Sequence, residues 1–283
     1  MNIFKSIPRK SIATAILVNC CLMHSLQADS SQYEGNMFEG TNLNHHWATF
    51  YKPPYIYKDN EIISVKATTS REALLSMVPK ELSINEDNQI IFFVGTFRVA
   101  AYPFSYKEAG IVIPVTYKKG TDEEKKGSFV PILYLDNISS IIGGRETYGY
   151  NKHYADIELV EKESSVRGIV NQNGKTLIDI SVSTDQPKVT DSLKLDSGGH
   201  FVIKRIPAAV YDGSLEIHQL NYVEVSDYVV EDYIPGAGGL TLGGPEWEQL
   251  NKIPINNILE AYYSTTSSTL GAGTTLHDYL NNN

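Results

Sequence analysis

The sequence is built largely from short apolar runs with turn residues between them. Most of these runs are rich in valine, isoleucine, threonine and aromatic residues, which favour β-strands, and the chain contains 18 tyrosines. Asn173-Gly174, between two such runs, is a strong signal for a two-residue hairpin. The pattern predicts a mainly β, mainly antiparallel protein, with strands expected at 61–67, 90–97, 111–117, 129–136, 156–160, 165–170, 176–182, 201–206, 214–225 and 258–264.

Other local signals predict a short helix and two loops. Thr69-Ser70-Arg71-Glu72 resembles a capping box at a helix start, and Pro79 stops the apolar run that follows. The charged segment 118–127 is expected to be a solvated loop that joins two strands. The glycine-rich segment 236–244 lacks the GxGxxG spacing of dinucleotide-binding loops. It is expected to be a flexible loop, and whether it acts as a lid is left open.

The first 28 residues are typical of a secretory signal peptide. Lys5, Arg9 and Lys10 form a basic start, an apolar run follows, and Ala28 is a small residue at the expected cleavage point. The apolar run is too short for a membrane-spanning helix, and no later stretch is long enough. We therefore expect a secreted or periplasmic protein with no membrane span. Cys20 offers an alternative, as the lipidated residue of a lipoprotein.

Cleavage at Ala28 would change the chemistry that the chain can offer. It would remove Cys20 and Cys21, the only cysteines, and with them any cysteine nucleophile or disulfide. It would also remove three of the 24 basic residues and none of the 33 acidic ones, which changes the formal charge from −9 to −12. So acidic a chain is not expected to bind the phosphate backbone of nucleic acids.

No internal repeat or proline-rich linker divides the rest of the chain. We expect a signal peptide at 1–28, a flexible segment at 29–39, one β domain at 40–270 and a C-terminal tail at 271–283. Neither an HExxH nor a GxSxG motif is present. His45-His46 would point in different directions on a strand or a helix, and the other histidines are scattered. The sequence therefore gives no support for a metal site.

A lysine near position 150 has unusual surroundings. Lys152 follows Tyr150 and precedes His153 and Tyr154, and no acidic residue occurs between it and Asp156. Desolvation by tyrosine rings and repulsion by a neighbouring cation would disfavour the charged ammonium and leave a free amine. A free amine attacks ketones to form an imine. The alternative is an ordinary solvated lysine beside a strand.

Several short motifs, spread over about residues 55–264, resemble the acetoacetate decarboxylase family. They occur in the family's order: 73–79 with Leu82-Ser83-Ile84, Glu108-Ala109-Gly110 before Ile113-Pro114-Val115, Tyr134-Leu135-Asp136-Asn137, Gly144-Arg145-Glu146, Tyr150-Asn151-Lys152, 201–213 and 250–260. The resemblance implies an antiparallel β cone or barrel with a few short helices around a hydrophobic pocket. It also implies a homo-oligomer.

The resemblance assigns roles to individual residues. Lys152 falls on the lysine that forms a Schiff base, a mechanism for which acetoacetate decarboxylase is a standard example. Glu108 falls on the glutamate that positions the substrate and assists proton transfer. Tyr150, Arg145 and Glu146 would support the site. The implied activity is that of a carboxy-lyase that converts a small-molecule β-keto acid into a ketone and CO₂, without a metal or an organic cofactor.

Some positions depart from the family's pattern. His153 stands where the family has a second lysine, so activation of Lys152 is expected to rest mostly on desolvation. Asn60 aligns with a pocket arginine, Phe93 with a second pocket glutamate, and Asn151 replaces a proline. Without the arginine, which could bind a carboxylate through two hydrogen bonds, acetoacetate is a less suitable substrate. An apolar Phe93 favours a larger or less charged keto acid.

Three functions are compatible with these residues. The first is decarboxylation of a β-keto acid through a lysine imine. The second uses the same imine for aldolase or dehydratase chemistry on a larger keto acid. The third is a non-catalytic protein of the same fold that binds a small ligand. The joint presence of Lys152 and Glu108 favours an enzyme, because a binding protein has no chemical need for the pair.

Overall fold

The computed structural model describes residues 53–100, 105–119, 123–190, 193–194, 198–210, 212–245 and 250–281. The predicted signal peptide, the segment 29–39 and His45-His46 lie outside these residues. No helix in the described part of the chain is long and apolar enough to cross a membrane.

The predicted mainly β fold is confirmed, and each of the ten predicted strands overlaps a strand of the structure. The strands are β1 (Tyr55–Thr68), β2 (Leu82–Ile84), β3 (Gln89–Arg98), β4 (Ser105–Lys119), β5 (Glu123–Leu135), β6 (Lys152–Tyr154), β7 (Asp156–Lys162), β8 (Ser165–Gln172), β9 (Lys175–Ser183), β10 (Leu193–Lys194), β11 (Gly199–Pro207), β12 (Leu215–Pro235), β13 (Gly238–Leu242) and β14 (Asn257–Asp278). The helical segments are α3 (Arg71–Met77), α4 (Ile138–Gly143), the π-helical turn η2 (Gly144–Tyr148) and the 3₁₀ turn η3 (Leu250–Lys252).

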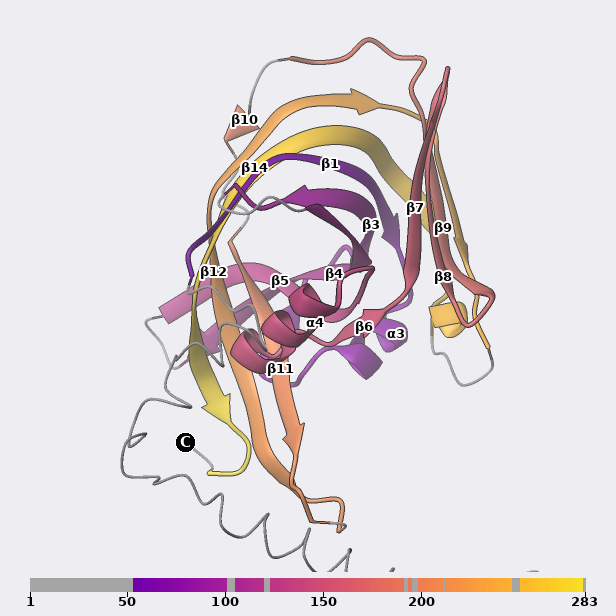
Figure 1. The fold of residues 1–283 in the computed structure, drawn as a ribbon. Coiled ribbons are helices and arrows are strands. Elements are labelled where there is room, and N and C mark those ends of the chain that lie inside the picture. The colour runs from indigo at the N-terminus through magenta and orange to yellow at the C-terminus, as the bar shows by residue number, and fades with distance from the viewer. Residues whose placement is uncertain are drawn as a thin grey trace, which may run out of the picture. The chain divides into compact units, whose positions relative to one another are not determined.

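The main sheet closes on itself into a cone. Strands β4, β3, β1, β14, β12, β11 and β5 pair in that order, and β5 pairs again with β4. Most of these pairings are antiparallel, but β5 runs parallel to both β11 and β6. The long strands β1, β12 and β14 arch over the interior (Figure 1). Because side chains alternate along a strand, every second residue of these strands faces the enclosed space.

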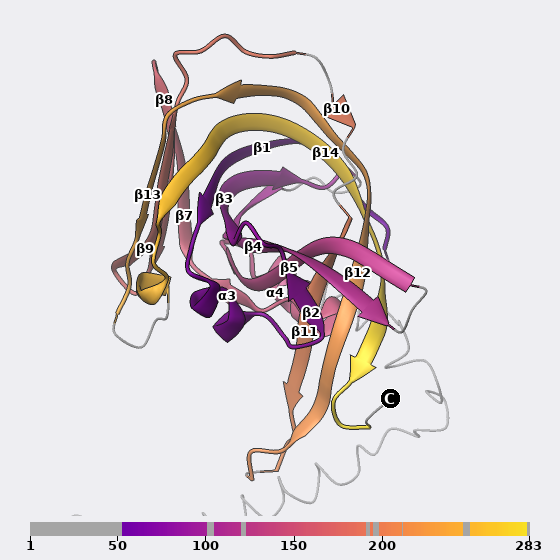
Figure 2. The same cartoon turned by 180° about the vertical axis from the view of Figure 1, so that it is seen from behind.

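A second sheet packs against one side of the cone. Its strands lie in the order β13-β9-β8-β7, and both views show them standing beside the curved strands (Figures 1 and 2). The main hydrophobic core includes buried residues of both sheets, among them Ile63 and Val94 of the cone and Ile178 and Ile180 of β9. The core therefore lies largely between the two sheets, which leaves the inside of the cone free for a cavity.

Two local predictions about turns and caps can be compared with the structure. Asn173 and Gly174 form the predicted hairpin between β8 and β9, with φ values of 52° and 72°, as a two-residue turn of this kind requires. The predicted helix is α3, but its cap is Ser70, whose hydroxyl accepts a hydrogen bond from the Ala73 N–H at 3.1 Å. Thr69 lies one residue outside the cap.

The glycine-rich segment 236–244 is not a flexible loop, so that prediction is wrong. Its central part is strand β13, which pairs with β9. The glycines allow neighbouring strands to approach closely, since a Cβ atom on Gly238 would lie 2.5 Å from the Cβ of Ala261. Thr241 is the one β-branched residue of β13, so the strand carries little of the composition by which strands are recognised in a sequence.

Two further boundaries differ from the prediction. Residues 271–278, expected to be part of a tail, form the end of β14 and pair with β12 as far as Asp278. Most of the charged segment 118–127 belongs to β4 and β5, which face each other at Lys118 and Glu124 with an ion pair of 2.8 Å. In both cases pairing with a neighbouring strand overrides a sequence that is rich in small or charged residues.

Candidate active site

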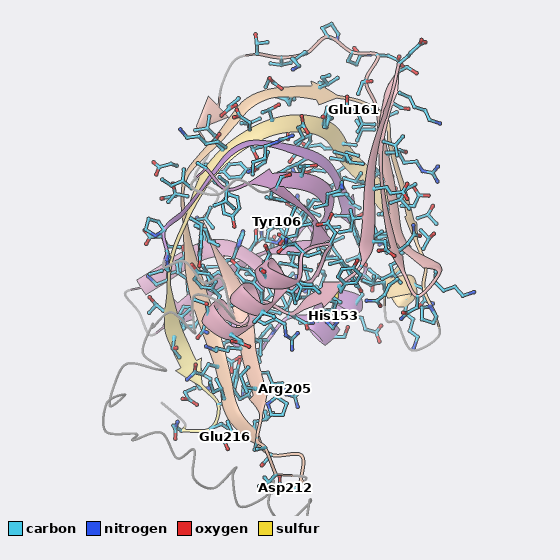
Figure 3. All side chains as sticks on the ribbon, in the orientation of Figure 1. Tyr106, His153, Glu161, Arg205, Asp212 and Glu216 are labelled. Atoms are coloured by element: carbon cyan, nitrogen blue, oxygen red, sulfur yellow. The ribbon has the colours of Figure 1, made fainter. Side chains whose placement is uncertain are left out.

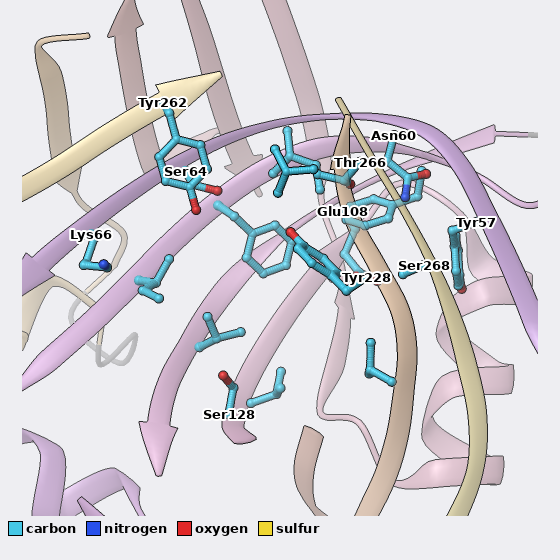
Figure 4. A pocket seen from close by; sticks show the side chains of 18 of the residues that line it. Tyr57, Asn60, Ser64, Lys66, Glu108, Ser128, Tyr228, Tyr262, Thr266 and Ser268 are labelled. Atoms are coloured by element: carbon cyan, nitrogen blue, oxygen red, sulfur yellow. The ribbon is translucent and has the colours of Figure 1, made fainter. Parts of the chain in front are cut away.

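The cone encloses a cavity of about 850 Å³, lined by inward-facing side chains of its strands. Ile62, Ser64 and Lys66 of β1 illustrate the alternation, as every second residue lines the wall. Figure 4 shows Ser64 and Lys66 there. Most of the wall is apolar, and polar groups occur at separate points along it. Figure 4 shows Glu108, Asn60 and Thr266 in one part of the wall and Ser64, Lys66 and Tyr262 in another. An apolar cavity with a few polar groups is the usual form of a small-molecule site.

Lys152 projects into this cavity from the short strand β6. It pairs with Leu133 of β5, and its side chain is buried while those of His153 and Tyr154 are exposed. The Nζ atom donates a hydrogen bond of 2.9 Å to Oε2 of Glu108, which comes from β4. Lys152 and Glu108 are 8% and 9% exposed, so they form a buried ion pair in the cavity wall.

The segment before β6 is shaped to make room for the lysine. The π-helical turn η2 begins at Gly144, where a Cβ atom would lie 2.6 Å from Cε of Lys152. Any larger residue at this position would therefore displace the lysine side chain. Arg145 of the same turn donates a hydrogen bond of 3.2 Å to the Lys152 carbonyl oxygen and ties the turn to β6. π-helical turns often occur at functional sites.

Two tyrosine rings enclose the lysine. Nζ of Lys152 lies 5.9 Å from the ring centroid of Tyr106 and 5.4 Å from that of Tyr150. Burial raises the pKa of both phenols well above the usual range, so both stay protonated at neutral pH. Tyr106 also shares a hydrogen bond of 3.1 Å with Tyr57, and Figure 3 shows it inside the arch of the strands. The two rings therefore shield the amine from water.

His200, at the start of β11, is a wall residue that the sequence did not single out. Its Nδ1 atom forms a hydrogen bond of 2.8 Å with the Tyr150 hydroxyl. Burial, and to a smaller degree the positive charge of Lys152, lower the pKa of His200 to about 4. No sequence signal points to it, because its place depends on the parallel pairing of β11 with β5. Tyr106, by contrast, lies two residues before Glu108, so strand alternation could have placed both on one face.

The predicted supporting residues divide into two groups. Tyr150, Asn60 and Phe93 line the cavity, although the Asn60 side-chain oxygen is already bonded to the Arg98 N–H at 2.9 Å. Three other residues do not line it. His153 and Glu146 are exposed, which corrects their expected place in the pocket, whereas Arg145 supports the site from outside the cavity through its hydrogen bond to the Lys152 carbonyl oxygen. His153 points away because it follows the inward-facing Lys152 on the same strand.

No group of three or more metal-binding side chains is arranged to hold an ion among the described residues. The fold and the site together define a β-cone protein whose cavity carries a buried lysine–glutamate pair. The profile of the family described as "Acetoacetate decarboxylase (ADC)" matches residues 42–280. The chain belongs to the acetoacetate decarboxylase family.

Individual relatives cover most of the chain. Acetoacetate decarboxylase 3 of Mesorhizobium japonicum is 30% identical over 238 residues, which span 82% of this chain and 88% of the relative. The acetoacetate decarboxylase of Clostridium botulinum is 27% identical over 234 residues, 82% and 92% of the two chains. The crystal structure of acetoacetate decarboxylase from Legionella pneumophila superposes with a TM-score of 0.69 at 24% identity, covering 82% and 90%. This structural similarity supports the same fold.

Proposed function

We propose that this chain is a cofactor-independent lyase that decarboxylates a β-keto acid through a Schiff base on Lys152. The observation that carries the proposal is the buried Lys152 Nζ, which faces the cavity at 2.9 Å from Glu108. Membership of the family supports Schiff-base chemistry. The small-molecule keto acid would be the only partner that the reaction needs.

The first step requires Lys152 to be a neutral amine, and we propose that the Glu108 carboxylate removes its proton. The proton of the Lys152 ammonium passes along the existing hydrogen bond to the carboxylate. The free amine then attacks the ketone carbon. The carbinolamine hydroxyl takes up the proton held by Glu108 and leaves as water, which gives a protonated imine and returns Glu108 to the carboxylate. The surrounding phenols of Tyr106 and Tyr150 keep bulk water away from the imine.

The second step breaks the bond between the α-carbon and the carboxylate. The electron pair of this bond moves into the imine, the nitrogen becomes neutral, and CO₂ leaves. Apolar wall residues such as Phe93, Val130 and Leu133 favour the change from a charged carboxylate to neutral CO₂. Glu108 then takes up a proton from solvent and passes it to the enamine carbon, and hydrolysis releases the ketone and restores the lysine.

Trapping the imine tests the proposal. The protein is incubated with acetoacetate and with a panel of larger keto acids, reduced with borohydride, and mapped by mass spectrometry while CO₂ release is measured. We expect an adduct on Lys152 and release of CO₂, both lost in Lys152→Ala but kept in Lys175→Ala, which changes an exposed lysine. Absence of any adduct on Lys152 would overturn the Schiff-base mechanism and leave a non-catalytic binding role.

The size of the cavity favours a second candidate, enamine chemistry on a larger keto acid. A volume of about 850 Å³ is in the range of sites for drug-sized ligands and far exceeds the needs of acetoacetate. One protein of similar fold, the enduracididine biosynthesis enzyme MppR, was solved with the condensation product of pyruvate and imidazole 4-carboxaldehyde, at a TM-score of 0.67 and 17% identity. An adduct on Lys152 without CO₂ release would favour this aldolase-type or dehydratase-type reaction.

Export and assembly are further parts of the proposal. The basic start and apolar run of residues 1–28 support secretion or delivery to the periplasm, with cleavage near Ala28. The N-terminal sequence of protein recovered from each cell fraction tests this. The resemblance to the family supports a homo-oligomer, which sedimentation of the mature protein tests.

A further inference from the structure

His200 occupies a defined position beside the lysine–glutamate pair. On β11 it lies between Ser128 of β5 and Val223 of β12, neither of which is titratable. The titratable groups that face it are Tyr150, through the hydrogen bond of 2.8 Å, and Lys152, whose charge acts on it. His200 is partly exposed and lines the cavity, so its remaining free surface borders the space where a substrate would bind.

The hydrogen bond to Tyr150 indicates which ring nitrogen of His200 carries the proton. Tyr150 is buried and its phenol is protonated, so its O–H needs an acceptor. Among the described residues the acceptor is Nδ1 of His200. If Nδ1 accepts, the neutral imidazole carries its proton on Nε2. No described residue accepts a hydrogen bond from Nε2, and it therefore remains available to a ligand.

The two lysines of the cavity wall are already paired. Lys152 is bonded to Glu108, and Lys66 is bonded to Glu260 at 2.8 Å. The side-chain oxygen of Asn60, which aligns with the family's pocket arginine, accepts a hydrogen bond from the Arg98 N–H, and its amide group carries no charge. The described wall residues include no arginine. A carboxylate that entered near Lys152 would find a neutral donor there in place of an unpaired cation.

We propose that His200, oriented by Tyr150, binds the substrate carboxylate next to Lys152 through one hydrogen bond from Nε2–H. This role rests on the proposed function, and it makes His200 a residue that selects β-keto acids over simple ketones. The low pKa of His200 agrees with a neutral ring during the reaction. A single neutral donor orients the carboxylate but stabilises its charge less than an arginine would, which leaves more of the driving force for its loss as CO₂.

Two amide substitutions separate the possible roles of the ring. In His200→Asn the amide occupies the place of Nδ1 and can still contact Tyr150, but nothing reaches the position of Nε2. In His200→Gln the amide reaches the position of Nε2 and restores a neutral donor to the cavity. Neither amide titrates, so neither can replace a histidine that transfers protons.

Two reactions of the same lysine provide the readout. Decarboxylation of acetoacetate needs the carboxylate, whereas deuterium exchange of acetone in D₂O needs only the imine and the enamine. We expect His200→Asn to lower kcat/KM for acetoacetate by about 10- to 100-fold, the effect of one hydrogen bond to a charged group. The fold-loss in the rate of acetone exchange should be about ten times smaller than this loss. His200→Gln should recover most of the loss.

Other results would contradict the proposed role of His200 in binding the carboxylate. Equal losses in both reactions, or a Gln variant no better than the Asn variant, would overturn the carboxylate-binding role and point to proton transfer or structure. Unchanged decarboxylation in both variants would overturn it as well. If the wild-type protein itself neither exchanges acetone nor forms a borohydride adduct on Lys152, the proposed function fails, and this failure is visible before any His200 variant is compared.

Discussion

Lys152 Nζ and Glu108 Oε2 lie 2.9 Å apart with both side chains buried in the cavity wall. Two opposite charges removed from water need each other, because either one alone would be left without a partner in an apolar environment. The pair therefore combines a structural and a chemical role. It keeps the lysine in place as an ammonium, and it provides the carboxylate that can remove the proton.

The first prediction concerns the stability of this pair. Lys152→Met and Glu108→Gln each leave one buried charge unpaired, and each should lower the free energy of unfolding by about 3–5 kcal/mol. The double variant has no buried charge, so it should lose less than the sum of the single losses. Urea unfolding of the four proteins measures this coupling. Additive losses would show that the two groups do not interact in solution.

The second prediction concerns Gly144. Its replacement by alanine places a Cβ atom 2.6 Å from Cε and 3.0 Å from Nζ of Lys152, so the lysine must move away from Glu108. We expect Gly144→Ala to lose about 1–3 kcal/mol of stability by overpacking and to lower kcat about 100-fold or more, because a misplaced nucleophile loses alignment. Assays of CO₂ release measure kcat, and thermal unfolding measures the stability.

Gly168→Ala is the matched control for this variant. A Cβ atom there would lie 2.6 Å from the Cβ of Val94, in the interface between the two sheets and away from the lysine. It should lose stability to a similar degree, whereas kcat per folded molecule changes little. Equal losses of kcat in both variants would contradict the positioning role of Gly144.

The third prediction concerns the histidine next to the nucleophile. His153 is exposed and points away from the cavity, with its Nε2 atom 2.9 Å from Oδ1 of Asn151. His153→Ala should therefore change kcat/KM by less than about threefold, in line with a surface substitution. A steady-state assay next to His200→Asn makes the comparison. A loss as large as that of the His200 variant would show that His153 reaches the substrate.

The positions of His153 and His200 in the structure show what the sequence could and could not predict. Lys152 and Glu108 were found because they belong to short motifs in a recognisable order. The outward direction of His153 follows from strand alternation, but β6 has three residues and too weak a signal to be predicted as a strand. His200 is brought to the site by pairing between strands far apart in the sequence, which no local pattern records.

The strands show the same limit. Runs of β-branched and aromatic residues predicted the longer strands, since these side chains fill a pleated surface between two layers. Strand β13 and the end of β14 escaped prediction because their small residues serve close contact, as Gly238 does against Ala261. Where the backbone itself is the packing surface, the sequence carries the composition of a loop.

The last prediction concerns the pH dependence of stability. The pKa of His200 is about 4 in the folded protein against an ordinary value of 6.5, so the unfolded chain binds more protons between these values. The contribution of His200 to the free energy of unfolding is then fully present above about pH 6.5 and is lost as the pH falls towards 4, by up to about 3 kcal/mol.

His200→Gln lacks this group, so the difference in unfolding free energy between wild type and variant should shift in favour of the variant by this amount from pH 7 to pH 4. Urea unfolding of both proteins at a series of pH values measures it. A constant difference across this range would mean that the pKa of His200 is the same in the folded and the unfolded protein, which would contradict the prediction.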